Sequence, residues 1–478
     1  MPLSRRPATG LGVVAATTLA AFSVLPSTVG AAPAPTDTTA GRAAASWLAG
    51  EYADGALPGP FGGQDWGLTV DGLLALAATG VDTPTRQAAT RQVAAHVRSY
   101  NSYDDYGIEG FTDGGATAKL LYAASAVGAD PTDFGGYDLR AETLSLVAGA
   151  DTGHQRGRIT SRTTADSGPD ASNTFDQSFA VLGLVRSGGA PPETVDFLVR
   201  QQCAAGGFRL YPDTASGPSP ACDEQPDAVL DVDSTAMATQ ALLAAAEDGA
   251  TGAADAARRG VDWLVTRQHA DGSFGGSGPT VGANANSTGL AGQALAAAGR
   301  DAEAARAAGA LTALQLTTAT GGAAAADAGA VAYDTAGFTA AVTAGIADTG
   351  RDQWRRATAQ AVLGLAQVPL GRIGVDLPPT SPQPTATGTA SPTPSGSPTP
   401  TGSPDPTGTA SPTPSATASP TTSPTPPPTT TPAPAPPAPG PGRLPTTGAA
   451  VVSYVLVALL MVGGGVALLV LTRRRRTT

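Results

Sequence analysis

Apolar side chains recur every three or four positions in six stretches of the chain, and each stretch follows a Gly-rich loop that ends in Asp or Asn. This spacing places the apolar residues on one face of an α-helix. A short polar side chain at the start can accept hydrogen bonds from the free N–H groups of the first turn, and a glycine suits the end. The six expected helices begin at Asp71, Asp113, Asp176, Asp233, Asn286 and Asp334.

A second kind of helix precedes these loops, and an aromatic residue followed by leucine marks the same position in three of them. The turn after that position has one spacing, in Glu51-x-x-x-Gly55-x-Leu57, Gln202-x-x-x-Gly206-x-Phe208 and Gln268-x-x-x-Gly272-x-Phe274. Glycine permits a tight turn, the ring covers the helix ends, and Gln can bond to free backbone groups. The second, third and sixth repeats lack this motif. All six repeats are nevertheless interpreted as helical hairpins.

The turn motif resembles the Q-x-x-x-G-x-W repeat of squalene and terpene cyclases. The resemblance covers residues 41–375 and implies an all-α fold, an α/α toroid of about six helical hairpins that ends in a helix at 353–366. Prenyltransferase β-subunits, cobalamin carriers and complement-type thioester domains share this ring. It implies an inner barrel of the Ala-rich helices and an outer shell of the others. Since such rings serve unrelated functions, the resemblance indicates a fold and not an activity.

Both ends of the chain have the pattern of targeting segments. Two arginines, a short apolar run and small residues at 1–31 are typical of a secretory signal peptide. At 444–478, the sequence Leu-Pro-Thr-Thr-Gly precedes an apolar stretch long enough to cross a bilayer and four arginines. This order resembles the sorting signal of Gram-positive surface proteins. It implies that a sortase cuts between Thr447 and Gly448 and joins Thr447 to cell-wall peptidoglycan. An uncut single-span membrane protein is the alternative.

Residues 376–443 are rich in Pro, Thr and Ser and cannot bury a core. Prolines favour an extended conformation, so we expect a disordered stalk. The expected organisation is a signal peptide (1–31), a toroid (41–375), the stalk (376–443) and a sorting signal with a transmembrane helix (444–478). The membrane would be contacted only through that last helix, before sorting.

The charge balance excludes some partners. Six of the 28 Lys and Arg residues lie in the two targeting segments, whereas 39 residues are acidic, so a mature charge of roughly −17 argues against nucleic acid. The three histidines are scattered and no Cys or His cluster has ligand spacing, so neither a metal nor a cofactor is expected.

Cys203 and Cys222 are the two cysteines of a chain that carries an export signal, which favours a disulfide between them. The alternative rests on Cys222-Asp223-Glu224-Gln225, which resembles the Cys-Gly-Glu-Gln thioester of complement-type toroids. In that case Asp223 would replace the glycine and Cys203 would be left unpaired.

The sequence Asp231-Val232-Asp233-Ser234-Thr235-Ala236 resembles the D-x-D-D-T-A motif of class II terpene cyclases. In those enzymes the middle aspartate protonates an alkene, because burial and a neighbouring carboxyl group keep it un-ionised. Ser234 stands where the motif has its third aspartate. Because Asp233 also occupies the start position shared by the six repeats, we interpret it as a helix cap and only a weak catalytic candidate.

Two loops, 61–67 and 100–107, combine aromatic and acidic residues. Both precede inner helices, so a toroid would bring them to one end, and rings beside carboxylates suit ligand binding. Trp66 is expected in a loop. The expected ligand-binding residues, two of them from a third loop, are Asp65, Trp66, Tyr103, Asp105, Tyr106, Phe208 and Tyr211. The alternative is that these residues merely close the end of the barrel.

The sequence therefore predicts a secreted, cell-wall-anchored surface protein whose toroid binds a ligand or partner at its mouth without catalysis. The ligand class (small molecule, glycan or protein) stays open. The alternative is an extracytoplasmic enzyme on the same fold, either terpene-cyclase-like or carbohydrate-active.

Overall fold

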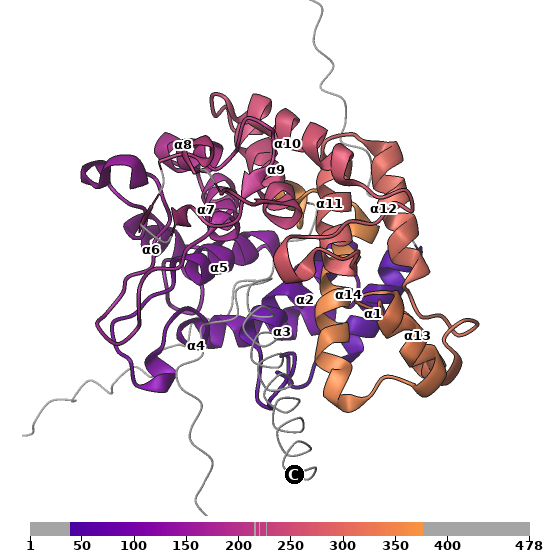
Figure 1. The fold of residues 1–478 in the computed structure, drawn as a ribbon. Helices are drawn as coiled ribbons and strands as arrows, with labels where there is room; N and C mark the ends of the chain where they lie inside the picture. The colour runs from indigo at the N-terminus through magenta and orange to yellow at the C-terminus, as the bar shows by residue number, and fades with distance from the viewer. Residues whose placement is uncertain (1–38, 215–216, 219, 226, 376–478) are drawn as a thin grey trace, which may run out of the picture.

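The computed structural model describes residues 39–375 except 215–216, 219 and 226, and this part is mainly helical (Figure 1). The predicted signal peptide (1–31), stalk (376–443) and sorting signal (444–478), with Thr447 and Gly448, lie outside the described residues. Within the described ranges, no helix has the length and apolar character needed to cross a membrane.

An inner barrel of six helices forms the centre of the described domain, and each helix contacts the next around the ring. The last of them contacts the first, so the ring is closed. Close approach depends on small residues: a Cβ on Gly183 would lie 2.9 Å from Cγ of Leu121 in the neighbouring helix. In ring order the six helices are α2 (Trp66–Thr79), α5 (Gly114–Ala126), α7 (Thr174–Arg186), α9 (Val232–Glu247), α11 (Ala285–Ala297) and α14 (Arg351–Ala366).

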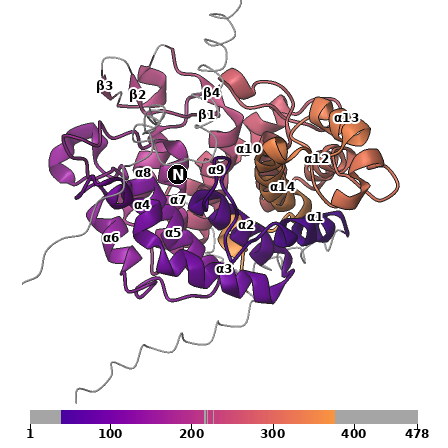
Figure 2. The same cartoon turned by 90° about the horizontal axis from the view of Figure 1, so that it is seen from below.

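An outer shell of helices packs against this barrel and buries its apolar side, as α8 does with Val195, Phe197 and Leu198. The first outer helix, in indigo, lies beside the last inner helix, in orange, in both views (Figures 1 and 2). The chain is therefore an α/α toroid, and the fold expected from the sequence is confirmed. The outer helices are α1 (Thr39–Gly50), α3 (Thr83–Ala95), α6 (Leu139–Ser145), α8 (Pro192–Arg200), α10 (Ala253–Arg267) and α12 (Asp301–Ala313).

Short elements fill the connections. The described strands have two residues each: β1 (Phe208–Arg209) pairs antiparallel with β4 (Leu230–Asp231), and β2 (Asp213–Thr214) pairs with β3 (Gly217–Pro218). The short helix α4 (Val97–Asn101) follows α3. The 3₁₀ turns are η1 (Asp104–Tyr106), η2 (Ala150–Gln155), η3 (Cys222–Glu224), η4 (Gly278–Thr280), η5 (Gly322–Asp327), η6 (Asp348–Gly350) and η7 (Leu370–Arg372).

Most inner helices begin earlier than the sequence predicts. Asp113 caps α5 as expected, with Oδ1 accepting from the N–H of Ala116. In four other repeats the predicted caps were wrong, because Asp71, Asp176, Asp233 and Asn286 lie inside their helices. The side chains that cap those four helices belong to Asp65, Asn173, Asp231 and Asn284.

The sixth inner helix was also wrongly predicted. Asp334 does cap a helix, but this helix, α13 (Thr335–Ala344), packs against η5 and is largely exposed. The inner position belongs to α14. Its Thr358 accepts a hydrogen bond from the loop N–H of Val331, as Thr235 of α9 does from Phe208. The sequence pattern of a capped, Ala-rich helix therefore does not distinguish an inner helix such as α9 from an exposed one such as α13.

The Gln of the turn motif joins neighbouring repeats. Nε2 of Gln202 donates to the carbonyl of Gly206 and to that of Ala256 in the next outer helix, and Gln268 makes the corresponding pair of bonds. The sixth repeat makes the same kind of link, but its Gln and Gly lie farther apart in the sequence than in the turn motif, so the motif does not reveal it. Nε2 of Gln315 donates to the carbonyls of Gly329 and Ala40, which links the last repeat to α1 and closes the ring.

Residues 367–373, the C-terminal plug, close the end of the barrel at which the inner helices finish. Leu370 and Ile373 are 2% and 0% exposed within the core. Four inner helices bind the backbone of the plug through polar side chains. Tyr122 donates to the carbonyl of Leu370, Arg186 to that of Gly371 and Gln293 to that of Val368, and Gln240 accepts from the N–H of Leu370. The described chain leaves the domain at this closed end.

Candidate functional site

The other end of the barrel, the mouth, is where all inner helices begin. Neighbouring inner helices run parallel, as shown by Asp176 of α7, whose carboxyl group covers Gly115 of α5 one residue into that helix. The loops before the inner helices therefore meet at this one end. We define the mouth by these loops, which are residues 51–65, 102–113, 157–173, 201–231 and 268–284, together with 315–334, which precedes α13 and bonds to the inner helix α14 through Val331.

A buried ion pair lies below the mouth between α2 and α5. Nζ of Lys119 lies 2.6 Å from Oδ1 of Asp71 and 3.3 Å from the carbonyl oxygen of Gly67. Lys119 is 2% exposed, so its ammonium group has left water and depends on these partners. Burial raises the pKa of Asp71, and the charge of Lys119 opposes that rise. We did not predict this pair, because Lys119 lies within an apolar helical pattern.

A second ion pair joins the first and last inner helices at the mouth. Arg356 of α14 binds Asp65, the cap of α2, and also Asp352 on its own helix. Asp65 is therefore buried and paired, and one of its oxygens accepts from the N–H of Leu68. Its side chain stabilises both the helix start and the closed ring.

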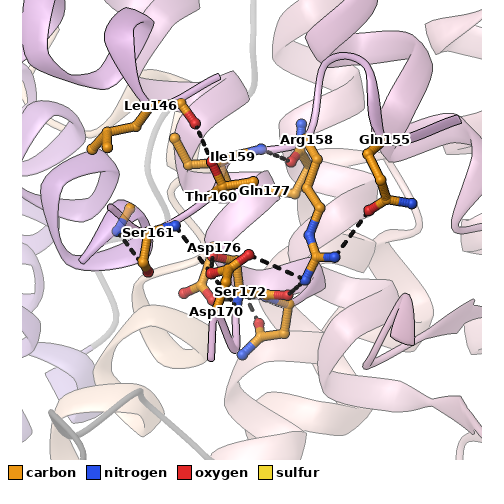
Figure 3. A network of polar contacts seen from close by, with 12 residues as sticks. Leu146, Gln155, Arg158, Ile159, Thr160, Ser161, Asp170, Ser172, Asp176 and Gln177 are labelled. Carbon is orange, nitrogen blue, oxygen red and sulfur yellow. Dashed lines mark hydrogen bonds and ion pairs between the residues drawn. The ribbon is translucent and has the colours of Figure 1, made fainter. Parts of the chain in front are cut away.

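The carboxyl groups of Asp113, Asp170 and Asp176 interact where α5 and α7 begin, and Figure 3 shows Asp170 and Asp176. Asp170 is held on its loop by the N–H groups of Ser161 and Ser172, at 3.0 and 3.1 Å, and by Arg158 at 3.6 Å. Asp176 accepts from the N–H of Asn173 at 2.8 Å. Burial, with the charge of Asp113, raises the pKa of Asp176 to about 8. Asp176 therefore retains a proton at neutral pH.

This proton predicts how stability depends on pH. Since the pKa of Asp176 rises from 3.8 to about 8 on folding, unfolding releases its proton between those values, and the free energy of unfolding falls as pH rises through this window. The slope contributed by one such group is up to about 1.4 kcal/mol per pH unit. We expect Asp176→Asn to flatten the slope in urea titrations between pH 5 and pH 8.

Asp130→Asn is the control for this measurement, because the pKa of exposed Asp130 is lowered by bonds to Thr132 and its carboxyl group is already ionised above pH 5. A slope that Asp176→Asn leaves unchanged would contradict the assigned proton.

Asp233 does not cap α9, so that interpretation was wrong. The cap is Asp231, whose Oδ2 accepts from both the N–H and the hydroxyl of Ser234 at 2.7 Å. Burial and the charge of Asp231 raise the pKa of Asp233 to about 7. Its Oδ1 is buried without a hydrogen-bond partner among the described residues, and so is Oδ1 of Asn286 on the next inner helix. This pair of open acceptors suits a hydrogen-bond donor, and the protonated form of Asp233 suits proton transfer.

Several residues predicted to bind a ligand are part of the packing. Trp66 is the first residue of α2, not a loop residue, and it stacks on His96 with ring centroids 4.2 Å apart. Tyr103 is buried and stacks on Phe111. Phe208 is fully buried in β1, so we do not include it in the site. Trp66 keeps partial exposure and lies beside Asp65 at the mouth.

The remaining predicted residues, Asp105, Tyr106 and Tyr211, are exposed on mouth loops. Cys203 and Cys222 form the disulfide that the sequence predicts, and this bond closes the loop that carries Tyr211. The thioester alternative is not supported, because Oε1 of Gln225 accepts from Arg209 at 2.6 Å. Across the described ranges, no group of three His, Cys, Asp or Glu side chains is placed to hold a metal ion.

Residues 436–477 match the LPXTG cell wall anchor motif. The chain is a cell-wall-anchored surface protein. The motif implies processing by sortase and attachment to peptidoglycan, as the sequence predicts. It covers the anchor and leaves the toroid unassigned, and no curated protein sequence matches the chain.

Solved structures resemble this surface protein in helical architecture. A protein from Actinoplanes has 19% identity over 69% of this chain and 99% of its own, with a TM-score of 0.45. The ent-copalyl diphosphate synthase from Streptomyces platensis has 19% identity over 63% of this chain and 50% of its own, with a TM-score of 0.38. Unsaturated glucuronyl hydrolase from Bacillus sp. GL1 has 15% identity over 68% of this chain and 94% of its own, with a TM-score of 0.41. Similarity at this level concerns the fold alone.

Proposed function

We propose that the protein is a surface receptor whose toroid holds a ligand at its mouth without transforming it. The observation that carries this proposal is the difference between the two ends of the barrel. The plug closes one end with buried Leu370 and Ile373. At the other end, aromatic rings and carboxyl groups of the inner helices keep partial exposure, as Trp66, Asp71 and Asp233 do. A ligand has polar and apolar partners only where solvent reaches them.

The proposed domain order supports display of this end. With a signal peptide at 1–31 and a stalk at 376–443 leading to the cut between Thr447 and Gly448, the chain continues toward the wall from the plugged end. The mouth lies at the opposite end of the barrel. A domain held through its plugged end would leave the mouth free to meet a ligand.

The binding chemistry would come from two layers. Inside the mouth, the half-buried residues Asp233 and Asn286 each have one buried acceptor oxygen without a hydrogen-bond partner among the described residues, and Trp66 presents part of a ring. On the surrounding loops, Asp105 and Tyr106 are exposed. A molecule with hydrogen-bond donors and an apolar or flat face fits this arrangement.

The test uses the mature protein released from the wall. Its melting temperature is measured with chito-oligosaccharides, muropeptides and cationic peptides at millimolar concentration. We expect at least one class to raise the melting temperature by several degrees, since saturation at about 100 times Kd stabilises by about 2.7 kcal/mol. Asp233→Asn should reduce this shift.

Asp248→Asn is the matched control, because Asp248 follows the same helix at its other end and is exposed. A shift lost equally in both variants, or no shift with any compound, would contradict the receptor proposal.

One observation favours a second candidate function, an extracytoplasmic enzyme. Asp233 holds its proton near neutral pH beside Asp231, the arrangement expected of a general acid. A cyclase-like activity would act on a polyprenyl diphosphate, and a carbohydrate-active one on a glycan. Product formed from geranylgeranyl diphosphate or chitohexaose by the wild type, and lost in Asp233→Asn, would replace the receptor proposal with this one.

A further inference from the structure

Exposed large apolar residues gather on the loops of the mouth. Of the seven in the described domain, five lie on these loops, and the other two are Leu144 on α6 and Val375 at the end. Single exposed apolar residues are common on protein surfaces, whereas several gathered at one end of a domain are typical of a binding surface. The five are Phe61, Tyr106, Tyr211, Val229 and Val281. We call them, with the acidic residues between them, the rim.

The rim is strongly acidic. Tyr106 follows two exposed aspartates, Asp104 and Asp105, in η1, and Glu109 is exposed three residues later. The loop that carries Tyr211 and Val229 also has exposed acidic residues, namely Asp223, Glu224 and Asp227. Negative charge and apolar surface are therefore interleaved along the same loops.

Arginines on the mouth loops do not neutralise this charge. Arg209 is buried, with its guanidinium bound to Gln201 and Gln225, and Arg158 is buried beside Asp170. Among the described residues of these loops, Arg162 is the exposed arginine, and it donates to Thr112. The field of the rim is therefore negative, and it repels anionic surfaces.

We propose that the rim docks a cationic polypeptide segment in which Lys or Arg alternates with apolar residues. Carboxylates pair with the cations, Tyr106 provides a ring face for cation–π contact, and Val229 and Val281 contact the apolar side chains. This deepens the proposed receptor function and rests on it. It names the class of partner and the outer part of the site.

Other occupants fit the charge less well. A second copy of this chain is acidic, with a formal charge of −11 before processing, and nucleic acid and anionic lipid are negative as well. The chain's own stalk (376–443) cannot supply the segment, because its charged residues are Asp376, Asp405 and a single cation, Arg443. A separate basic polypeptide remains as the complementary partner.

The rim is built to hold its shape. Tyr103, stacked on Phe111 with centroids 4.1 Å apart, supports Tyr106 from below at an edge-on distance of 6.2 Å. The Cys203–Cys222 disulfide ties the base of the loop that carries Tyr211. A preformed surface loses less conformational entropy on binding, so a short peptide can bind measurably.

The test titrates a fluorescein-labelled peptide of six alternating Lys-Leu pairs into the mature protein released from the wall. The same length of alternating Glu-Leu and unlabelled chitohexaose are the other probes. We expect the Lys-Leu peptide alone to bind, with affinity that falls as salt rises. The variant Asp104→Asn/Asp105→Asn/Tyr106→Ala should raise Kd at least tenfold, and Val281→Ser several-fold with the same salt dependence.

Glu247→Gln/Asp248→Asn, which removes two exposed charges from the opposite end of the barrel, should leave Kd unchanged. An equal loss in this control means unspecific attraction to an acidic protein and overturns the proposal. Binding of chitohexaose in place of the Lys-Leu peptide would overturn the proposal of a cationic polypeptide partner but leave the proposed receptor function standing. Failure of all probes here, together with failure of the wider ligand panel, overturns both.

Discussion

Leu370→Ala/Ile373→Ala is expected to lower the free energy of unfolding by about 4–10 kcal/mol, because each substitution removes a buried aliphatic side chain worth about 2–5 kcal/mol. The two side chains anchor the plug in the end of the barrel, and their loss also weakens the hydrogen bonds that Tyr122 and Gln240 make to it. Urea denaturation of the mature protein at 25 °C measures the change.

Val375→Ala provides the control, since Val375 lies two residues beyond the plug and is 51% exposed. It should change stability by no more than about 0.5 kcal/mol. A loss below about 1 kcal/mol in the double variant would mean that the plug rests on the barrel without sealing it.

Lys119→Met is expected to cost about 3–5 kcal/mol at pH 7, because it leaves the carboxylate of Asp71, whose side chain is only 15% exposed, without its cation. The cost should shrink as pH falls, because the pKa of Asp71 is already raised and its carboxylate takes up a proton more readily. Adding Asp71→Asn to Lys119→Met should recover most of the stability. Thermal and urea unfolding of the two single variants and the double variant form a complete cycle.

The exposed pair of Arg258 and Asp255 on α10 is the matched control for this cycle. Arg258→Met should cost less than about 0.5 kcal/mol, since solvent screens that pair. A Lys119→Met variant as stable as Arg258→Met would show that Asp71 and Lys119 do not depend on each other.

Repetition made the fold predictable from the sequence. Each repeat has to bury an apolar face against the next, and the turn motif with Gly206 or Gly272 marks where one hairpin meets its neighbour. The helix starts were less predictable, because several Asp and Asn residues lie close together before each inner helix. A threonine four residues after the cap, as Thr69 follows Asp65 and Thr235 follows Asp231, distinguishes the true cap, since its hydroxyl also bonds to the cap carbonyl.

The site was predictable only in its location. Loops before inner helices must share one end of a toroid, so Asp105, Tyr106 and Tyr211 could be placed at the mouth. Burial inside the ring could not be foreseen, because it depends on which face of each helix points inward. Asp71 and Lys119 occupy equivalent positions, six residues after the caps Asp65 and Asp113, and a charged pair at that repeat position was the available signal.

The plug could not be foreseen either. Residues 367–373 follow the last helix and precede a Pro-rich segment, so their sequence resembles the start of a linker. Their burial arises from polar partners on four different repeats, which no local pattern encodes.

Thiol labelling tests most directly whether the mouth is the accessible end of the ring. Both native cysteines are paired, so an introduced cysteine is the free thiol of the chain. Asn286→Cys and Gln293→Cys place it seven residues apart on α11, one at the mouth and one against the plug. We expect a maleimide to modify Asn286→Cys readily in the folded protein and Gln293→Cys on the order of a hundredfold more slowly, through local opening. Equal protection of both thiols would contradict an accessible mouth and, with it, the receptor.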